Sequence, residues 1–167
     1  HFKYTADRCP ATVLGFIDQG AFNTTGQIKA GAEAAVVLDK TCFYAEMGGQ
    51  VGDVGVIESD KGKFVVDATT KVADCVIHKG RLLEGAIAVG DKVAAIVSPD
   101  RDATKKNHTA THLLQWALRQ ILGSSVAQQG SLVCPDYLRF DFTYPKSLDA
   151  EQTKQVESLV RDKIAAD

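Results

Sequence analysis

The sequence contains no long uninterrupted apolar segment. No run approaches the roughly 18 residues that a membrane-spanning helix requires, and the first residues, His1-Phe2-Lys3-Tyr4, lack the charged and apolar regions of a signal peptide. Internal repeats and low-complexity tracts are also absent. We therefore expect an intracellular, cytoplasmic protein that makes no membrane contact.

Paired cysteines are missing as well. The four cysteines, Cys9, Cys42, Cys75 and Cys134, are widely spaced and form no Cys-x-x-Cys motif. This spacing indicates neither a disulfide framework nor a self-contained four-cysteine zinc site. We expect free thiols, most of them buried.

An excess of positive charge is also absent. The chain has 19 Lys and Arg against 21 Asp and Glu, for a net charge of −2. This balance argues against a protein that binds nucleic acid through its overall charge, so DNA is not expected as a partner and any RNA contact must come from a local patch. The 167 residues, 45% of them hydrophobic, suit one ordinary domain or two small ones.

Short segments rich in β-branched residues fill the first 98 residues, with glycine-bearing or polar turns between them. Many short strands at this spacing predict a small barrel or sandwich, which we assign to residues 1–98. Strands are expected at 13–17, 34–38, 54–57, 63–67, 72–78 and 92–97, and turns at 18–20, 59–62, 79–80 and 89–91.

The pattern changes at Ser98-Pro99, which suits the N-cap and first residue of a helix, while Gly123 suits the residue after its end. Apolar residues at three- and four-residue steps between these points predict one long amphipathic helix. Two strands, at 126–133 and 137–142, and a helix from about Ser147 follow. Residues 99–167 therefore form a second domain of order α, β, β, α, and the fold class is α+β.

His108 and His112 lie four residues apart on the long helix, so their side chains point to the same side about one turn from each other. Two imidazoles in this geometry can chelate a metal. An isolated pair of this kind is a chance occurrence on a solvated face about as often as it is a metal site. A zinc protease would have glutamate where Thr109 stands, so that class is excluded.

Residues 41–53, 107–114, 128–133 and 138–142 form four blocks that together resemble the editing region of alanyl-tRNA synthetases. Residues 107–114, Asn-His-Thr-Ala-Thr-His-Leu-Leu, resemble the zinc-binding helix that the alanyl and threonyl enzymes share. Residues 41–53, Thr-Cys-Phe-Tyr-Ala-Glu-Met-Gly-Gly-Gln-Val-Gly-Asp, are similar to the glycine-rich motif of the alanyl branch, which threonyl enzymes lack. Residues 128–133 and 138–142 look like its next two blocks, and the resemblance spans residues 2–167.

The resemblance implies hydrolysis of the ester that joins serine or glycine to tRNA(Ala), with no covalent nucleophile. It further implies that residues 99–167 are the first part of a two-layer α/β editing core with a long zinc-site helix. Mischarged tRNA(Ala) would be the partner, and the full protein would carry an aminoacylation domain that uses ATP and magnesium. A free-standing editing enzyme and a tRNA-binding or assembly module without activity remain alternatives.

The resemblance also assigns residue roles. His108 and His112 match two of four zinc ligands; the other two, a downstream Cys-x-x-x-His pair, do not occur in this chain. We therefore expect a truncated site with weak or no zinc binding and little activity. Thr111 and Gln128 match pocket positions whose hydroxyl and amide can hydrogen-bond a serine side chain. The plain alternatives are a helix surface residue for Thr111 and a polar strand residue for Gln128.

The remaining candidates are substrate or tRNA contacts. Paired glycines in the glycine-rich loop suit either close approach to a ligand or a tight turn. Asp141 either faces the pocket, as a further catalytic candidate, or forms an ion pair with Arg139. Separately, an editing core that ends after its second helix leaves a sheet edge uncovered, which predicts self-association into a homodimer. The contact candidates are Glu46, Gly48, Gly49 and Gln50 on the loop, and Arg101 and Arg119, which project with Lys105 to the flank of the helix that carries the histidines.

Overall fold

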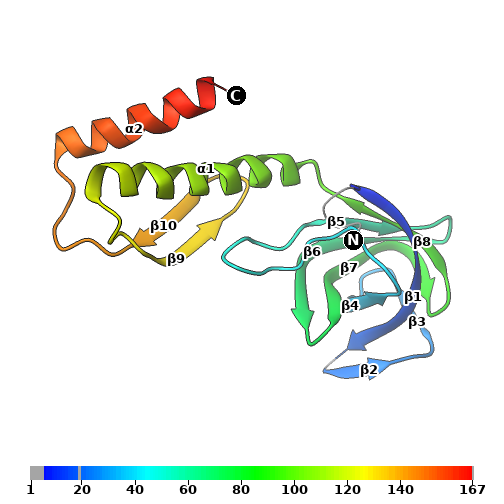
Figure 1. Ribbon diagram of the computed structural model, residues 1–167. Coiled ribbons are helices and arrows are strands. Elements are labelled where there is room, and N and C mark those ends of the chain that lie inside the picture. The colour runs from blue at the N-terminus through cyan, green and yellow to red at the C-terminus, as the bar shows by residue number, and fades with distance from the viewer. Residues whose placement is uncertain (1–5, 19, 167) are drawn as a thin grey trace. The chain divides into compact units, whose positions relative to one another are not determined.

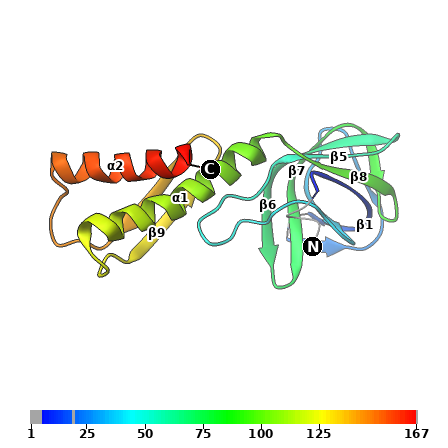
Figure 2. The same ribbon diagram turned by 45° about the horizontal axis from the view of Figure 1, so that its top comes forward.

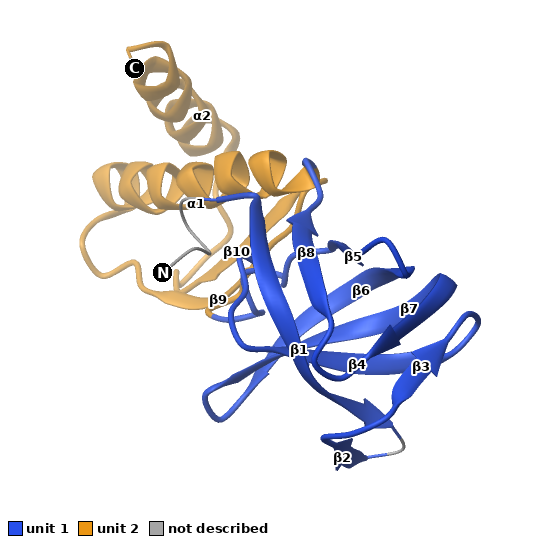
Figure 3. Ribbon diagram, turned by 90° about the vertical axis from the view of Figure 1, so that its right-hand side faces the viewer, with its two compact units in different colours: residues 1–47, 51–99 blue, residues 48–50, 100–167 orange. Residues whose placement is uncertain are grey.

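The computed structural model describes residues 6–18 and 20–166, and the chain divides into two compact units. Unit 1 comprises residues 1–47 and 51–99, and unit 2 comprises residues 48–50 and 100–167 (Figure 3). The glycine-rich segment, expected to lie wholly in the first domain, is divided between the units, because residues 48–50 belong to unit 2. The predicted α+β class, with a small β-barrel at the N-terminal side, is confirmed.

Unit 1 is built on a closed antiparallel barrel of six strands (Figure 1). Neighbouring strands follow the order β1-β4-β7-β6-β5-β8, and β8 pairs with β1 to close the ring. Two further strands, β2 and β3, pair with β1 and β7. The bounds are β1 Arg8–Asp18, β2 Ala21–Asn23, β3 Gln27–Lys29, β4 Glu33–Leu38, β5 Gly55–Glu58, β6 Gly62–Val72, β7 Cys75–Ala88 and β8 Lys92–Val97.

The barrel core follows from the alternation of side chains along each strand. In β1, for example, Cys9, Ala11 and Val13 are buried while the residues between them are more exposed. The same alternation on the other strands brings large apolar side chains such as Phe64 and Leu82 into one cluster. The strands of unit 1 curve around into a barrel in both ribbon views (Figures 1 and 2).

A buried histidine anchors the segment that leads from β4 into the glycine-rich loop. The Nδ1 of His78 lies 3.0 Å from the carbonyl oxygen of Val36, and its Nε2 lies 2.8 Å from the hydroxyl of Thr41. A carbonyl can only accept, so Nδ1 carries the proton and Nε2 accepts from Thr41. Burial lowers the pKa of His78 to about 4. The ring is therefore neutral at pH 7.

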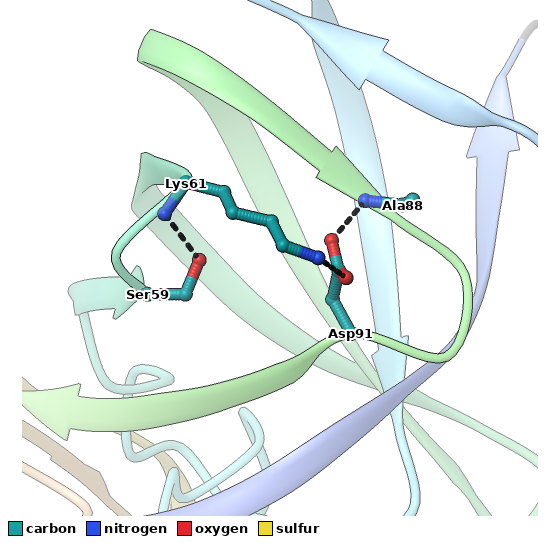
Figure 4. A network of polar contacts seen from close by, with 4 residues as sticks. All are labelled: Ser59, Lys61, Ala88 and Asp91. Atoms are coloured by element: carbon teal, nitrogen blue, oxygen red, sulfur yellow. Dashed lines mark hydrogen bonds and ion pairs between the residues drawn. The ribbon is translucent and has the colours of Figure 1, made fainter.

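The turns before β6 and before β8 are joined by an ion pair (Figure 4). The Nζ of Lys61 lies 2.5 Å from the carboxylate of Asp91, which also accepts a hydrogen bond from the Ala88 amide at 2.8 Å. The hydroxyl of Ser59 accepts from the Lys61 amide at 3.2 Å. The hydrogen bond between the charged partners raises the pKa of Lys61 and lowers that of Asp91. Each partner therefore favours the charged form of the other.

Unit 2 consists of two helices and a two-stranded antiparallel sheet: α1 Asp100–Leu122, β9 Gln128–Val133, β10 Leu138–Phe142 and α2 Ala150–Ala165. The two helices lie side by side in both views, and α1 packs against the sheet (Figures 1 and 2). Gly123 ends α1 with a positive φ of 101°, as its position predicted. α2 begins with a reciprocal capping box between Asp149 and Gln152.

The core of unit 2 is smaller than that of unit 1. Four residues, Ala117, Leu118, Val126 and Val156, form its buried centre, with partly exposed apolar residues packed around them. The corresponding cluster of unit 1 contains sixteen buried residues.

Neither helix of the described residues combines the length and apolar character that a membrane crossing requires.

Three local predictions are corrected. The segment 72–78, expected to be one strand, instead contains the turn between β6, which ends at Val72, and β7, which begins at Cys75. The turn expected at 79–80 does not exist, because β7 continues through Gly80 to Ala88. Glycine is needed there for close packing: a Cβ atom on Gly80 would collide with the carbonyl of Val65 on β6. The cysteines are thiols as expected, but only Cys9 and Cys42 are buried; Cys75 is exposed and Cys134 partly so.

Candidate functional site

The predicted histidine pair lies on one side of α1. The ring centroids of His108 and His112 are 5.1 Å apart, and their planes are inclined by 40°. His108 is partly buried, whereas His112 is exposed. The two rings thus lie next to each other on the same side of the helix, as the four-residue spacing predicted.

A side chain from the glycine-rich loop binds one of the two rings. The Oε1 of Gln50 lies 2.6 Å from the Nδ1 of His108. An amide oxygen can only accept, so Nδ1 of His108 donates and carries the ring proton. The lone pair of the neutral ring is then on Nε2. Gln50 was predicted as a tRNA contact, and this hydrogen bond to the metal-ligand candidate was not foreseen.

Residues 48–50 form the tip of the glycine-rich loop and run beside β9. The carbonyl of Gly49 accepts a hydrogen bond from the Val133 amide at 2.8 Å, and Gln50 forms a parallel bridge with Val133. Gly49 has a φ of 84°, and a Cβ atom there would collide with the side chain and backbone of Ser131. Close backbone approach is therefore the reason for glycine at this position.

The loop tip also reaches the candidate Gln128. The amide nitrogen of Gln128 donates to the hydroxyl of Ser131 at 3.1 Å, and that hydroxyl lies 3.5 Å from the carbonyl oxygen of Gly48. A β-bulge makes this possible, because β9 advances two residues, 128 to 130, while β10 advances one. Such a bulge re-aims side chains along a strand. Ser131 was not among the predicted site residues.

Thr111 is buried on α1, with only 7% of its surface exposed, so it is not the helix surface residue of the plain alternative. Its hydroxyl donates to the carbonyl of Asn107 at 2.8 Å. The Asn107 amide in turn donates to the carbonyls of Cys134 and Pro135, at 2.8 and 3.1 Å. Asn107, for which no role was predicted, therefore holds the turn between β9 and β10 against α1.

Asp141 lies apart from the other catalytic candidates. Its carboxylate forms an ion pair with Arg139 at 3.1 Å, the alternative that the sequence left open. Phe140 and Phe142, its neighbours on β10, pack into the core beneath the helices. Because side chains alternate across a strand, Asp141 lies on the sheet face opposite to that core. The structure therefore does not bring it together with Thr111 or Gln128.

The three remaining candidates for contact with substrate or tRNA differ in exposure to solvent. Arg101 was predicted to contact substrate or tRNA from the flank that carries the histidines, but its side chain is buried, at 6% exposure. Arg119 is exposed, and its Nε donates to the carbonyl of Val126 at 3.0 Å. Glu46 belongs to unit 1, is exposed, and donates its amide to the carbonyl of Thr69 at 2.9 Å.

Asp53 closes the neck of the glycine-rich loop in unit 1, a role that sequence reasoning missed. Its buried carboxylate accepts from the Tyr44 amide at 2.6 Å, and its own amide donates to the Tyr44 carbonyl at 2.9 Å. The Thr69 hydroxyl donates to its backbone carbonyl at 2.7 Å. An aspartate that follows a glycine-rich turn was the available signal.

The donor set supplies half of a zinc site. Imidazole nitrogens are good zinc ligands, and a proton held on Nδ1 of His108 leaves Nε2 suited to coordination. Zinc sites in proteins use three or four protein ligands. Among residues 6–18 and 20–166, no group of three or more His, Cys, Asp or Glu side chains could hold a metal. His108 and His112 therefore fit zinc as two ligands that require others.

Comparison with known proteins defines the class of protein. The family model described as tRNA synthetases class II (A) matches residues 1–101, which is more than half of the chain. Alanine–tRNA ligase of Thermus thermophilus is 53% identical over 138 residues, covering 82% of this chain, and the Leptospira biflexa and Chloroflexus aurantiacus enzymes are each 44% identical over 98% and 99% of it. The chain therefore belongs to the alanyl-tRNA synthetase family. It spans 16% to 18% of the length of these relatives.

Proposed function

We propose that the chain takes part in proofreading by an alanyl-tRNA synthetase, as part of the region that hydrolyses serine or glycine wrongly attached to tRNA(Ala). One observation carries this proposal: the His108 and His112 pair on α1 lies with the loop tip at Gln50 in a chain of this family. The synthesis of alanyl-tRNA from ATP, alanine and tRNA(Ala) is proposed for the whole protein, which by analogy would bind ATP and magnesium elsewhere.

The need for a second site follows from the limits of the first. A pocket shaped for alanine cannot exclude the smaller glycine by size. It also rejects the added hydroxyl of serine only about 10²-fold, too little for accurate translation. A separate hydrolytic site that recognises the wrong product supplies the missing discrimination.

In the proposed site, the polar groups of unit 2 bind and orient the aminoacyl ester. Gln128 and Ser131 offer an amide and a hydroxyl on β9, both suited to a serine hydroxyl or to the attacking water. The hydroxyl of Thr111 donates to the helix, but its oxygen retains capacity to accept. Positioning of water and ester by such fixed groups lowers the barrier without a covalent intermediate.

His108 and His112 would hold zinc together with ligands from outside the described residues. When bound, zinc supplies a positive charge that polarises a carbonyl oxygen or lowers the pKa of water. The contribution of this chain is the orientation of the two rings, one of which is held by Gln50. Asp141 has no proposed part in the reaction, because its carboxylate is paired with Arg139 on the other face of the sheet.

The test is the hydrolysis of Ser-tRNA(Ala) and Gly-tRNA(Ala) by this chain and by a version that continues through a Cys-x-x-x-His pair of the natural protein. Turnover by the longer version that is lost in Gln128→Leu and retained in Gln120→Leu supports the proposal. Gln120 is the matched control, because it is exposed on α1 and outside the site. The proposal fails if the longer version with all four ligands hydrolyses neither ester.

A second candidate function is tRNA binding or assembly without hydrolysis, including dimerisation. The observation that favours it is the pair of only two ligands among the described residues. Binding of tRNA(Ala) by both versions without turnover by either would select this candidate. Sedimentation of the chain would show at the same time whether it forms dimers.

A further inference from the structure

The loop tip touches both halves of the candidate site. Gln50 binds the ring of His108, and Gly48 accepts the hydroxyl of Ser131, which in turn accepts from Gln128. These residues are far apart in sequence: 58 positions separate Gln50 from His108. The contacts therefore connect the loop tip, residues 48–50, to side chains on both α1 and β9.

The hydrogen bond to His108 has a definite chemical consequence. The two nitrogens of a neutral imidazole differ, and the partner of one decides which of them carries the proton. With Oε1 of Gln50 at 2.6 Å, Nδ1 is the donor and Nε2 is the nitrogen with a free lone pair. An oxygen acceptor on the distal nitrogen is the usual way in which proteins orient a histidine that ligates a metal.

The backbone of the loop tip is placed well enough to perform this role. The carbonyl of Gly49 accepts a hydrogen bond from the Val133 amide at 2.8 Å, and Gln50 forms a parallel β-bridge with Val133. The absence of a Cβ at Gly49 permits this close contact with Ser131. The side chain of Gln50, which is partly buried, therefore starts from a fixed backbone position.

We propose that Gln50 is a positioning residue that holds His108 in the Nδ1-protonated tautomer and thereby directs Nε2 to the metal and substrate side of the site. This inference rests on the proposed editing function, which it deepens by assigning the glutamine of the glycine-rich loop to a ring of the zinc-site helix. Within the described part of the chain His112 has no comparable amide acceptor, and it is exposed, so it serves as an internal reference.

The tautomer is measured directly by NMR. In the chain with ¹⁵N-labelled histidine at a pH above 8, two-bond correlations from the ring carbons' protons distinguish a protonated from an unprotonated nitrogen. The signals of His108 are assigned with His108→Gln. We expect a protonated Nδ1 and an unprotonated Nε2 for His108 in the wild-type chain. A predominantly unprotonated Nδ1 overturns the proposal, because the Gln50 amide would then donate to the ring.

Three variants separate positioning from general structure. Gln50→Leu removes the acceptor at nearly the same size, and we expect the His108 signals to move towards the mixed tautomers of an unconstrained ring. Gln50→Glu retains an acceptor oxygen and should restore the Nδ1-protonated pattern. Gln120→Leu, the same change at an exposed site on α1, should leave it unaltered. An unchanged His108 spectrum in Gln50→Leu overturns the proposal.

Titration with Zn²⁺ alone, carried out on the longer version that supplies the Cys-x-x-x-His pair, gives a second readout. Loss of an outer hydrogen-bond partner lowers metal affinity by roughly 10- to 100-fold in known sites, so Gln50→Leu should require at least about tenfold more Zn²⁺ to shift the His108 signals. Equal titration midpoints for Gln50→Leu and Gln120→Leu contradict the role. Neither measurement involves tRNA, so a failure here is distinct from an absence of hydrolysis in the deacylation test.

Discussion

Acid should weaken unit 1 through His78 before it affects the carboxylates. The ring is fully buried, and burial lowers its pKa from 6.5 to about 4. Protonation is therefore easier in the unfolded chain than in the folded one. The stability that comes from a neutral ring is complete above pH 6.5 and is lost as the pH falls towards 4.

The magnitude follows from the shift. A difference of one pKa unit between the folded and unfolded chain corresponds to about 1.4 kcal/mol. Because the pKa of His78 falls from 6.5 to about 4, we expect the free energy of unfolding to decrease by roughly 3 kcal/mol across this window. The carboxylates of Asp39 and Asp91 also have lowered pKa values, the first through its hydrogen bond from the Thr12 amide and the second through Lys61. Their contributions disappear only below their ordinary value of 3.8, so they do not overlap with most of the histidine window.

Urea unfolding at several pH values, followed by the amide signals of β4 and β7, measures the effect. The midpoint for the wild-type chain should fall steeply between pH 6.5 and 4, because these strands hold Val36 and His78. His78→Gln should be less stable at pH 7 but should lose little further stability in this window. His112→Gln, a change at an exposed ring, should behave as wild type. Parallel curves for wild type and His78→Gln would refute the reasoning.

Three further predictions concern packing. Gly49→Ala should displace the loop tip, and faster hydrogen exchange of the Val133 amide would show this. Position 48 has open space around it, so the control Gly48→Ala should cost only about 1 kcal/mol of backbone strain. Phe64→Ala should lower the free energy of unfolding by about 3 to 5 kcal/mol in urea titrations, and Leu83→Ala at an exposed site by under about 0.5 kcal/mol. Native-state hydrogen exchange should be slower in β6 and β7 than in α2, because unit 2 has the smaller buried core; equal rates would contradict this.

Much of the fold was predictable because its signals are local. Alternating apolar residues predicted the barrel strands, and the segment from Ser98 to Gly123 carried the apolar spacing and the terminal glycine of a helix. The three-residue strands β2 and β3 were missed because so short a segment carries no measurable periodicity. Gly80 was misassigned to a turn because its reason, close contact with β6, is a tertiary one.

The candidate site was predictable only as far as local geometry reaches. A four-residue spacing on a helix was enough to place His108 and His112 together, and alternation was enough to direct Phe140 and Phe142 to the core. The bulge at Gln129, which turns Gln128 towards Ser131, leaves no mark in a strand pattern of period two.

The link from Gln50 to His108 required the structure for a deeper reason. Two glycines with positive φ indicate a turn, and nothing in their local sequence says which surface the turn meets. The contact depends instead on the absence of a Cβ at Gly49 and on a free edge of β9 that accepts the loop tip. The same glycines therefore satisfy both interpretations that the sequence left open: they form a tight turn, and that turn brings Gln50 to the imidazole whose tautomer it controls in the mechanism proposed above.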